Sequence, residues 1–251
     1  MKLAALGSGS SGNATLLDTG NGLVVIDCGL TLKEVKRRLQ QIGNSPTDIV
    51  AILVTHEHSD HISGVAALSR HSGAPVYATR GTQKKLQNLE VSNVLAEQAF
   101  LLPEAGVEVL PVAVPHDARE PVQYVFCKGG FKAGVLTDLG CGTPHIAEAY
   151  ANCDALLIEA NHDREMLMNG NYPAALKRRI MSNWGHLSNC QTRSLLQQIF
   201  AVGKSPDTLV LGHLSQENNH PDRVMSSLEG LSMETTDVML ALQDEPLGWV
   251  G

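Results

Sequence analysis

The chain has 251 residues, of which 43% are hydrophobic, 18% are charged and 4% are aromatic. These proportions are close to those of an ordinary globular protein, so a sizeable core can be buried, built mainly from aliphatic side chains. The formal net charge of −7 argues against a protein that passively coats nucleic acid, because such proteins are usually basic. No apolar run approaches the roughly 18 residues that a transmembrane helix needs, so we expect no membrane partner.

The number and spacing of the cysteines indicate the cellular compartment. The first seven residues become polar too quickly for a signal peptide, and no two cysteines form a Cys-x-x-Cys pair. Scattered cysteines in odd number are typical of reduced thiols, so we expect a cytoplasmic protein. The five are Cys28, Cys127, Cys141, Cys153 and Cys190.

In the first third of the chain, strand-like and helix-like segments alternate. Residues 23–27 have the pattern of a buried strand that ends at an acid, and apolar residues recur at helical spacing over residues 31–42. Residues 49–54 indicate a second buried strand, which runs directly into a His-rich turn. A further helix is expected over residues 65–68.

The middle of the chain is richer in strands, and helices and strands alternate again towards its end. Because no linker, low-complexity tract or break in composition interrupts the pattern, we expect two sheets sandwiched by helices within one domain over residues 1–251. The expected strands here are 107–114, 122–127, 131–136, 155–158 and 209–211, with a hairpin turn at residues 129–130 and a helix around residues 195–199.

The His-rich turn carries the strongest chemical signal. His56, His58, Asp60 and His61 lie within six positions, directly after a buried strand. Imidazoles and carboxylates are the ligands that a borderline divalent metal prefers. Alternate residues of an extended chain project the same way, so His56 and His58 can share one ion, while Asp60 and His61 can serve a second ion nearby.

The motif His-x-His-x-Asp-His resembles that of the metallo-β-lactamase superfamily. Asp27 is similar to the family's first acidic position, which supports the metal-binding turn from outside the ligand set. His116, Asp138 and His213 each follow a strand and resemble the third histidine, the bridging aspartate and the final ligand. The resemblance implies an α/β fold, the four-layer αββα sandwich of the metallo-β-lactamase type.

The resemblance also implies two divalent metal ions that share a bridging hydroxide, the nucleophile of a hydrolase. Zn is the expected metal, with Mn or Fe as alternatives. One ion would take His56, His58 and His116. The other would take Asp60, His61 and His213, with Asp138 between the two ions, and Asp60 is expected to take part in catalysis as well.

Two segments are candidates for substrate contacts. The glycine- and serine-rich residues 7–13 offer hydroxyl and N–H groups to a phosphate, although a plain surface turn has the same composition. Residues 212–219 carry similar polar groups just after a predicted ligand. The expected contacts are Ser10, Ser11, Asn13, Ser215 and Asn218.

These segments, with residues 159–162 and 185–189, resemble the exonuclease-like YycJ/WalJ subgroup. By that resemblance Glu159 orients His186, and His186 donates a proton to the leaving oxygen of a phosphodiester. The chain lacks both the basic arm of tRNA-processing enzymes and the inserted domain of the RNA-cleaving β-CASP branch. We therefore expect a DNA exonuclease, with DNA favoured over RNA as the nucleic-acid partner.

Basic residues form three groups despite the acidic total. The group at residues 177–179 lies a few positions before His186, so it is the best candidate for contacts to backbone phosphates. The other groups read as solvated helix faces. They are Lys33, Lys36, Arg37 and Arg38, and Arg80, Lys84 and Lys85.

Two other functions remain open from the sequence. A small-molecule hydrolase that cleaves a thioester, lactone or β-lactam would keep the same metal site and would not need Glu159 or His186. A non-catalytic protein that binds nucleic acid or metal is the other alternative, although catalysis is the usual reason to keep an open metal site. The sequence does not indicate the oligomeric state.

Overall fold

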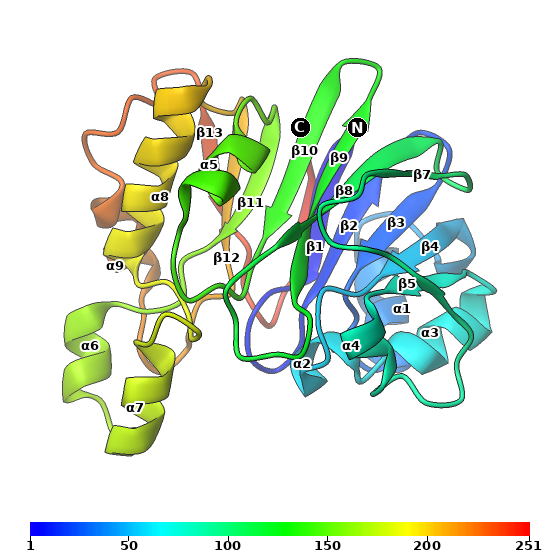
Figure 1. Cartoon of the computed structure of the whole chain (residues 1–251), viewed down its shortest axis with the longest axis horizontal. Helices are drawn as coiled ribbons and strands as arrows, with labels where there is room; N and C mark the ends of the chain where they lie inside the picture. The colour runs from blue at the N-terminus through cyan, green and yellow to red at the C-terminus, as the bar shows by residue number, and fades with distance from the viewer.

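A computed structural model describes all residues 1–251, and its strands form two seven-stranded sheets. Figure 1 shows the sheets packed against each other, with both chain ends lying close together over them. The first sheet has the order β14 (Leu247–Val250), β1 (Lys2–Gly7), β2 (Ala14–Asp18), β3 (Leu23–Ile26), β4 (Ile49–Leu53), β5 (Val76–Ala78) and β6 (Val91–Asn93). The second has the order β13 (Asp237–Leu240), β12 (Thr208–Gly212), β11 (Ala155–Glu159), β10 (Phe131–Leu136), β9 (Val122–Lys128), β8 (Val107–Ala113) and β7 (Phe100–Leu102).

The helices divide between the two outer faces, and α6 and α7 project beyond the edge of the second sheet (Figure 1). Beside the first sheet lie α1 (Leu32–Gln41), the 3-10 turn η1 (Pro46–Asp48), α2 (Ser59–Ile62), α3 (Val65–Ser72) and α4 (Arg80–Gln83). Beside the second lie α5 (Pro144–Tyr150), α6 (Arg164–Asn169), α7 (Ala174–Ile180), α8 (Asn189–Val202) and α9 (Pro221–Ser227).

Local sequence explains why α1 forms where it does. The Thr31 hydroxyl accepts a hydrogen bond from the Glu34 amide at 3.3 Å, which satisfies one of the free N–H groups at the start of the helix. Val35 and Leu39 are four residues apart, so they share the face that is buried against the first sheet. The helix therefore begins and ends within one residue of its predicted limits.

Three layers of apolar packing hold the four layers of secondary structure together. The central layer lies between the sheets and includes Ile26, Leu53, Tyr124 and Phe126. A second layer joins the first sheet to its helices, and a third joins the second sheet to its helices. The predicted four-layer αββα sandwich is confirmed, and the core shared by the two sheets supports our proposal of one domain over residues 1–251.

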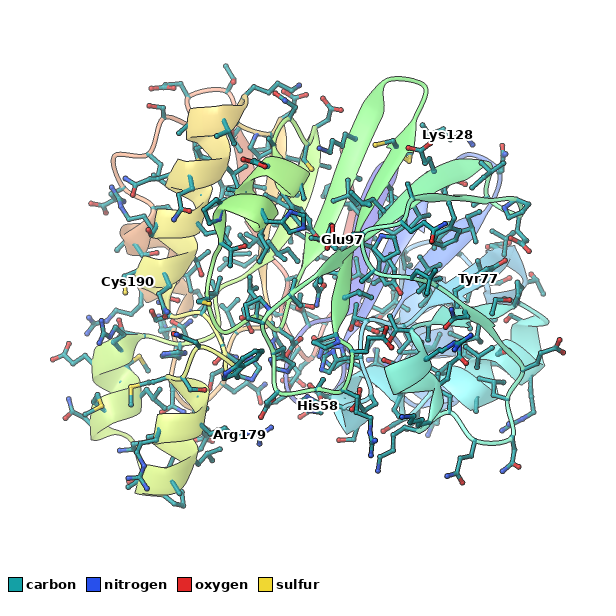
Figure 2. The ribbon with its side chains drawn as sticks, in the orientation of Figure 1. His58, Tyr77, Glu97, Lys128, Arg179 and Cys190 are labelled. Carbon is teal, nitrogen blue, oxygen red and sulfur yellow. The ribbon has the colours of Figure 1, made fainter.

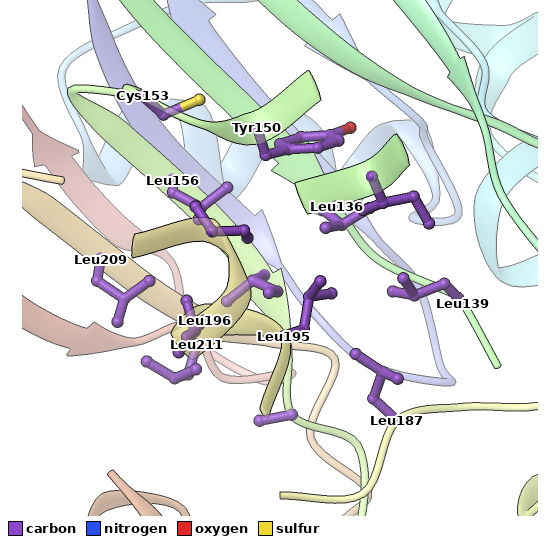
Figure 3. Packing of buried hydrophobic residues seen from close by; sticks show 14 of the residues in the cluster. Leu136, Leu139, Tyr150, Cys153, Leu156, Leu187, Leu195, Leu196, Leu209 and Leu211 are labelled. Carbon is purple, nitrogen blue, oxygen red and sulfur yellow. The ribbon is translucent and has the colours of Figure 1, made fainter. Parts of the chain in front are cut away.

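Figure 3 shows how the long helix α8 is seated. Leu195 and Leu196 of α8 pack over Leu156, Leu209 and Leu211 of the strands β11 and β12. Burial of a leucine side chain contributes about 1.5–3 kcal/mol, so this contact fixes the helix against the sheet. The loop that leads into α8 carries His186, and the packing therefore fixes the position of that histidine as well.

The sequence pattern did not anticipate several short elements. The helices α4, α6 and α7 have four, six and seven residues, and the strands β5, β6 and β7 have three residues each. Segments of this length show too little periodicity to be recognised. None of the helices combines the length and the apolarity that crossing a membrane requires.

Candidate metal centre

The polar side chains singled out in the sequence follow the carboxyl ends of strands that run in the same direction. Strands β3 and β4 are parallel neighbours, and so are β10, β11 and β12. Parallel strands end at the same edge of a sheet, so the loops that follow them meet there. His58 marks this edge in Figure 2. The edge brings together His56, His58, Asp60, His61, His116, Asp138, Glu159, His186 and His213.

Three histidines point ring nitrogens at one another. The Nε2 atom of His56 lies 3.0 Å from Nδ1 of His58, and Nε2 of His116 lies 3.3 Å from the same His58 atom. Burial lowers the pKa of His56 well below its usual value, and the neighbouring histidines lower it further. Facing lone pairs of neutral imidazoles repel each other unless a cation lies between them, so this group suits a metal ion.

The opposite ring nitrogens of these histidines are anchored. The Thr55 hydroxyl lies 2.9 Å from Nδ1 of His56, and Nδ1 of His116 donates to the Gly185 carbonyl at 3.0 Å. An anchor on one ring nitrogen fixes the tautomer and turns the other nitrogen towards a metal. The two rings are therefore oriented for ligation before any ion binds.

Asp27 anchors the turn from below. Its carboxylate accepts the Thr55 amide at 2.8 Å and the Thr55 hydroxyl at 2.7 Å, and it lies 2.7 Å from Nδ1 of His61. The Nε2 atom of His61 then faces the carboxylates of Asp60, at 3.3 Å, and Asp138, at 3.0 Å. The structure therefore places Asp27 as a support of the turn, outside the candidate ligand set.

Asp138 lies between the two groups of histidines. Its Oδ1 is 4.0 Å from Nε2 of His116 and 3.3 Å from Nδ1 of His213, and its buried Oδ2 lies 3.0 Å from Nε2 of His61. The Nε2 atom of His213 is buried without a hydrogen-bond partner and lies 3.7 Å from the Asp60 carboxylate. Such a group costs about 1–3 kcal/mol when nothing satisfies it, so a bound cation fits this donor set.

The backbone is strained at three of these positions. Asp27, Asp138 and His213 have φ angles of 61°, 50° and 55°, in the left-handed region that residues other than glycine rarely adopt. Each residue lies one or two positions after the end of a strand. Strain of about 1–3 kcal/mol per residue persists only where surrounding contacts hold it, and here two of the three residues, Asp138 and His213, are candidate ligands.

Glu159 joins two histidines. Its Oε1 lies 2.8 Å from Nδ1 of His186 and 2.9 Å from Nδ1 of His213, while its Oε2 accepts the Leu187 amide at 2.9 Å. Burial raises the pKa of Glu159, but His186 and His213 outweigh burial and hold the pKa at about 2. Burial lowers the pKa of His186, but the Glu159 charge outweighs it and raises the pKa. The pair is therefore a carboxylate that holds a proton on its histidine.

The second group of candidate ligands, which consists of Asp60, His61 and His213, attracts positive charge. Burial lowers the pKa of His213, but Asp138, Asp60 and Glu159 outweigh burial and raise it to about 10. The backbone of His213 is also held in place, because the Ser8 hydroxyl accepts a hydrogen bond from the His213 amide at 2.7 Å. The sequence analysis did not single out Ser8, since nothing distinguishes it from the neighbouring serines.

Two of the five residues expected to contact substrate line the cavity over the site, and the other three do not. Ser10 and Ser215 line the cavity over the site. Asn13 is buried instead, with its amide nitrogen 3.1 Å from Nε2 of His61 and 3.3 Å from the Asp60 carboxylate. The Ser11 amide donates to Gln243 on the surface, and Asn218 is buried beneath Ser215.

The cavity over the site has a volume of about 370 Å³ and two unlike walls. One wall carries the polar residues Asp60, Asp138, His186 and His213 together with Asn161, whose amide donates to the His213 carbonyl at 3.0 Å. The other wall belongs to the segment around α7 and presents Tyr172, Leu176 and Ile180 with Arg179. Tyr172 was missed from the sequence because it belongs to no recognisable motif, and Asn161 received no role although it lies in the segment 159–162.

The basic group on α7 is largely engaged within the protein. Arg179 forms an ion pair with Asp117, and Lys177 donates to the carbonyls of Met168 and Gly170 at 2.7 Å each. Asp117 in turn lies 3.5 Å from Nε2 of His116. Figure 2 shows Arg179 on the same edge of the molecule as His58. Two of the three cations expected to meet phosphates therefore have protein partners.

Comparison with known proteins agrees with this architecture. The sequence profile of the family described as "Beta-lactamase superfamily domain" matches residues 23–214. The chain is 38% identical to the exodeoxyribonuclease WalJ of Streptococcus pneumoniae serotype 2, with 87% of this chain and 83% of that protein covered. It is 34% identical to the exodeoxyribonuclease YycJ of Bacillus anthracis, with 87% and 84% covered.

A solved structure shares the fold over nearly the whole chain. The metallo-β-lactamase fold protein YhfI from Bacillus subtilis superposes with a TM-score of 0.74, covering 98% of each chain, at 13% sequence identity. At this identity the likeness bears on the fold alone. It places the two sheets and their flanking helices in the arrangement described above.

Proposed function

This chain belongs to the β-lactamase superfamily and, within it, to the YycJ/WalJ subgroup, and from that premise we propose that it is a metal-dependent exonuclease acting on DNA. The prediction of this membership from the His56–His61 motif is confirmed. The relatives' names support a nucleic-acid substrate and favour DNA. The observation that carries the proposal is the contact between the buried Glu159 and the partly exposed His186 beside the candidate metal ligands.

The donor set supports two divalent ions. One would be held by His56, His58 and His116, and the other by Asp60, His61 and His213, with Asp138 shared between them. When bound, such ions acidify water to supply a nucleophile near neutral pH and neutralise charge on phosphoryl oxygens. Three imidazoles at one position favour Zn, and the carboxylates at the other also admit Mn or Fe.

His186 performs the proton transfer in this proposal. Its Nδ1 is held by Glu159 at 2.8 Å, and its ring lines the cavity, so Nε2 is the nitrogen that meets a substrate. Because Glu159 keeps the ring protonated, Nε2–H can donate to the leaving oxygen as the P–O bond breaks. Hydrolysis of a thioester has less need for this pair, because a thiolate leaves without a proton more readily than an alkoxide does.

The two walls of the cavity suit a nucleotide. The polar wall offers the hydroxyls of Ser10 and Ser215 and the amide of Asn161 to phosphate oxygens. The opposite wall offers Tyr172, Leu176 and Ile180, which present aromatic and apolar surface on which a nucleobase can pack. A terminal nucleotide would therefore lie between α7 and the metal ligands.

The cysteines support a cytoplasmic location. All five are free thiols, and two of them, Cys28 and Cys153, are buried in the core. Burial raises the pKa of each of these two thiols to about 12, so they are poor nucleophiles at neutral pH. Free thiols are typical of a reducing compartment, and we propose that the protein works in the cytoplasm.

The proposal is tested with end-labelled oligonucleotides. The protein, loaded separately with Mn²⁺ and with Zn²⁺, is incubated with single-stranded DNA labelled at either end and with RNA of the same sequence. We expect release of nucleotides from DNA that stops when EDTA is added, and the faster-released label gives the polarity of digestion. Absence of release by protein that carries its metal complement would contradict the proposal.

A further inference from the structure

A second cavity adjoins the metal centre on the side away from α7. It has a volume of about 600 Å³ and is lined by α2 and α3, by the residues that follow α4, and by Arg119. Figure 1 shows α2 between α7 on one side and α4 on the other. The lower edge of the molecule therefore carries two hollows, with the candidate metal ligands where they meet.

The two cavities are neighbours at the edge of the metal centre. His58 and Ser59 line both of them, and the His58 side chain is 29% exposed. A polymer bound in the first cavity can thus extend over the surface at His58 and Ser59 towards the second.

Two cationic side chains, Lys85 and Arg119, line the second cavity. Lys85 is exposed and forms no ion pair or side-chain hydrogen bond in the structure. Arg119 is more than half exposed, with its Nε 3.6 Å from the Glu57 carboxylate. Glu57 also accepts the Arg119 amide at 2.9 Å, and it is the one acidic residue that lines this cavity.

We propose that the second cavity binds the phosphodiester backbone of the strand that continues beyond the terminal nucleotide. The inference rests on the proposed nuclease function, and it adds the path of the polymer. The first cavity has an aromatic and apolar wall, which suits a base, whereas the second has the unpaired Lys85 and the exposed Arg119, which suit phosphates. The sequence indicated only a solvated helix face for the basic group at residues 80–85. In this proposal one member of that group, Lys85, contacts the phosphates of the bound strand.

Direct binding tests this path without turnover. A fluorescent single-stranded DNA oligonucleotide is titrated with protein in EDTA, and anisotropy is followed at several salt concentrations. We expect Lys85→Ala to weaken binding about fivefold at low salt, and to reduce the slope of log K against log salt by about 0.7, the value for one lost phosphate contact. Lys2→Ala is the matched control, because Lys2 is exposed at the end of β1 farthest from Ser8 and the site.

A second variant tests whether the strand lies in the second cavity, and it does so without changing the charge of that cavity. Ala66 lines the second cavity on α3, so Ala66→Trp narrows that cavity and leaves the charges of Lys85 and Arg119 in place. We expect the same loss of oligonucleotide binding, with a circular dichroism melting curve like that of the parent protein. Wild-type affinity and salt slope in Lys85→Ala would overturn the inference, whatever the result with Ala66→Trp.

Turnover separates the inference from the function on which it rests. With the metal-loaded protein, we expect Lys85→Ala to raise KM for the oligonucleotide at least about three times more than KM for the dinucleotide TpT. An equal change for both substrates would overturn the proposed path while leaving the nuclease function standing. Failure of the parent protein to cleave either DNA would overturn the function, and the anisotropy experiment would still decide whether the cavity binds a strand.

Discussion

The metal centre and the rim around it are built in opposite ways. Each candidate histidine ligand in the centre except His58 is buried and has its second ring nitrogen held by a neighbour, as Asp27 holds His61 and Glu159 holds His213. On the rim, Arg179 and Lys85 are exposed, and Arg179 has one carboxylate partner whereas Lys85 has none. The contrast teaches that the chemistry is fixed by the core, whereas the choice of substrate depends on side chains that the fold leaves free.

Replacing His186 tests the centre most strongly. We expect His186→Ala to lower kcat on DNA by about 10³, because a positioned general acid contributes 10²–10⁴. Steady-state kinetics measure the effect, and metal analysis of the variant is the control. If kcat changed by less than about threefold with metal content intact, His186 would not be the proton donor.

Loss of Asp138 tests whether the carboxylate between the two groups of histidines is a metal ligand. An ion bound at a hundred times its Kd stabilises the folded chain by about 2.7 kcal/mol, which is roughly 5–10 °C in the melting temperature of a chain of this size. We expect Zn²⁺ to produce such a shift in the parent protein and Asp138→Ala to remove most of it. Calorimetry with and without Zn²⁺ measures both, and an undiminished shift in the variant would place the ions elsewhere.

The effect expected at Asp27 is intermediate in size, because Asp27 contacts the candidate ligand His61 and is not expected to contact an ion. Supporting residues of this kind typically change metal affinity by about 10–100-fold, and we expect a loss of that size in Asp27→Asn. Competition with a coloured chelator gives the affinity. A loss as complete as that of a direct ligand would show that the turn itself collapses, and a melting curve without metal distinguishes the two cases.

The smallest effect is expected at the rim. Arg179→Ala removes an ion pair to Asp117 whose arginine side chain is 59% exposed, and such surface pairs contribute about 0–1 kcal/mol. We expect unfolding free energy to change by no more than that, and DNA cleavage to change by less than about fivefold, as measured by urea titration and kinetics. A larger loss of cleavage would mean that Arg179 leaves Asp117 to contact the substrate.

Much of the centre could be predicted from the sequence, because ligands and strands alternate in a regular order. His56 to His61 follow one buried strand, and His116, Asp138 and His213 each follow another, so their order along the chain already indicated a shared edge. The pairing of Glu159 with His186 was expected from resemblance, and the structure brings the two side chains to 2.8 Å.

The rim could not be predicted in the same way. Nothing in the sequence shows that Asn13 is buried against His61, or that Lys177 is occupied by backbone carbonyls while Lys85 is free. These outcomes depend on which loops lie side by side after the sheets pack. The short helices α4, α6 and α7 were missed for the same reason, since tertiary contacts rather than periodicity stabilise them.

By itself, the sequence determined the family, the layered fold and the set of residues that can bind metal. The layered fold follows from the pattern of buried apolar residues in the strands. The family and the metal-binding residues follow from clustered histidines and aspartates, which are seldom found together except at metal sites. The tertiary structure alone decided the two walls of the first cavity and the presence of a second cavity beyond His58. Both depend on distances between segments far apart in the chain, which only the packed core sets.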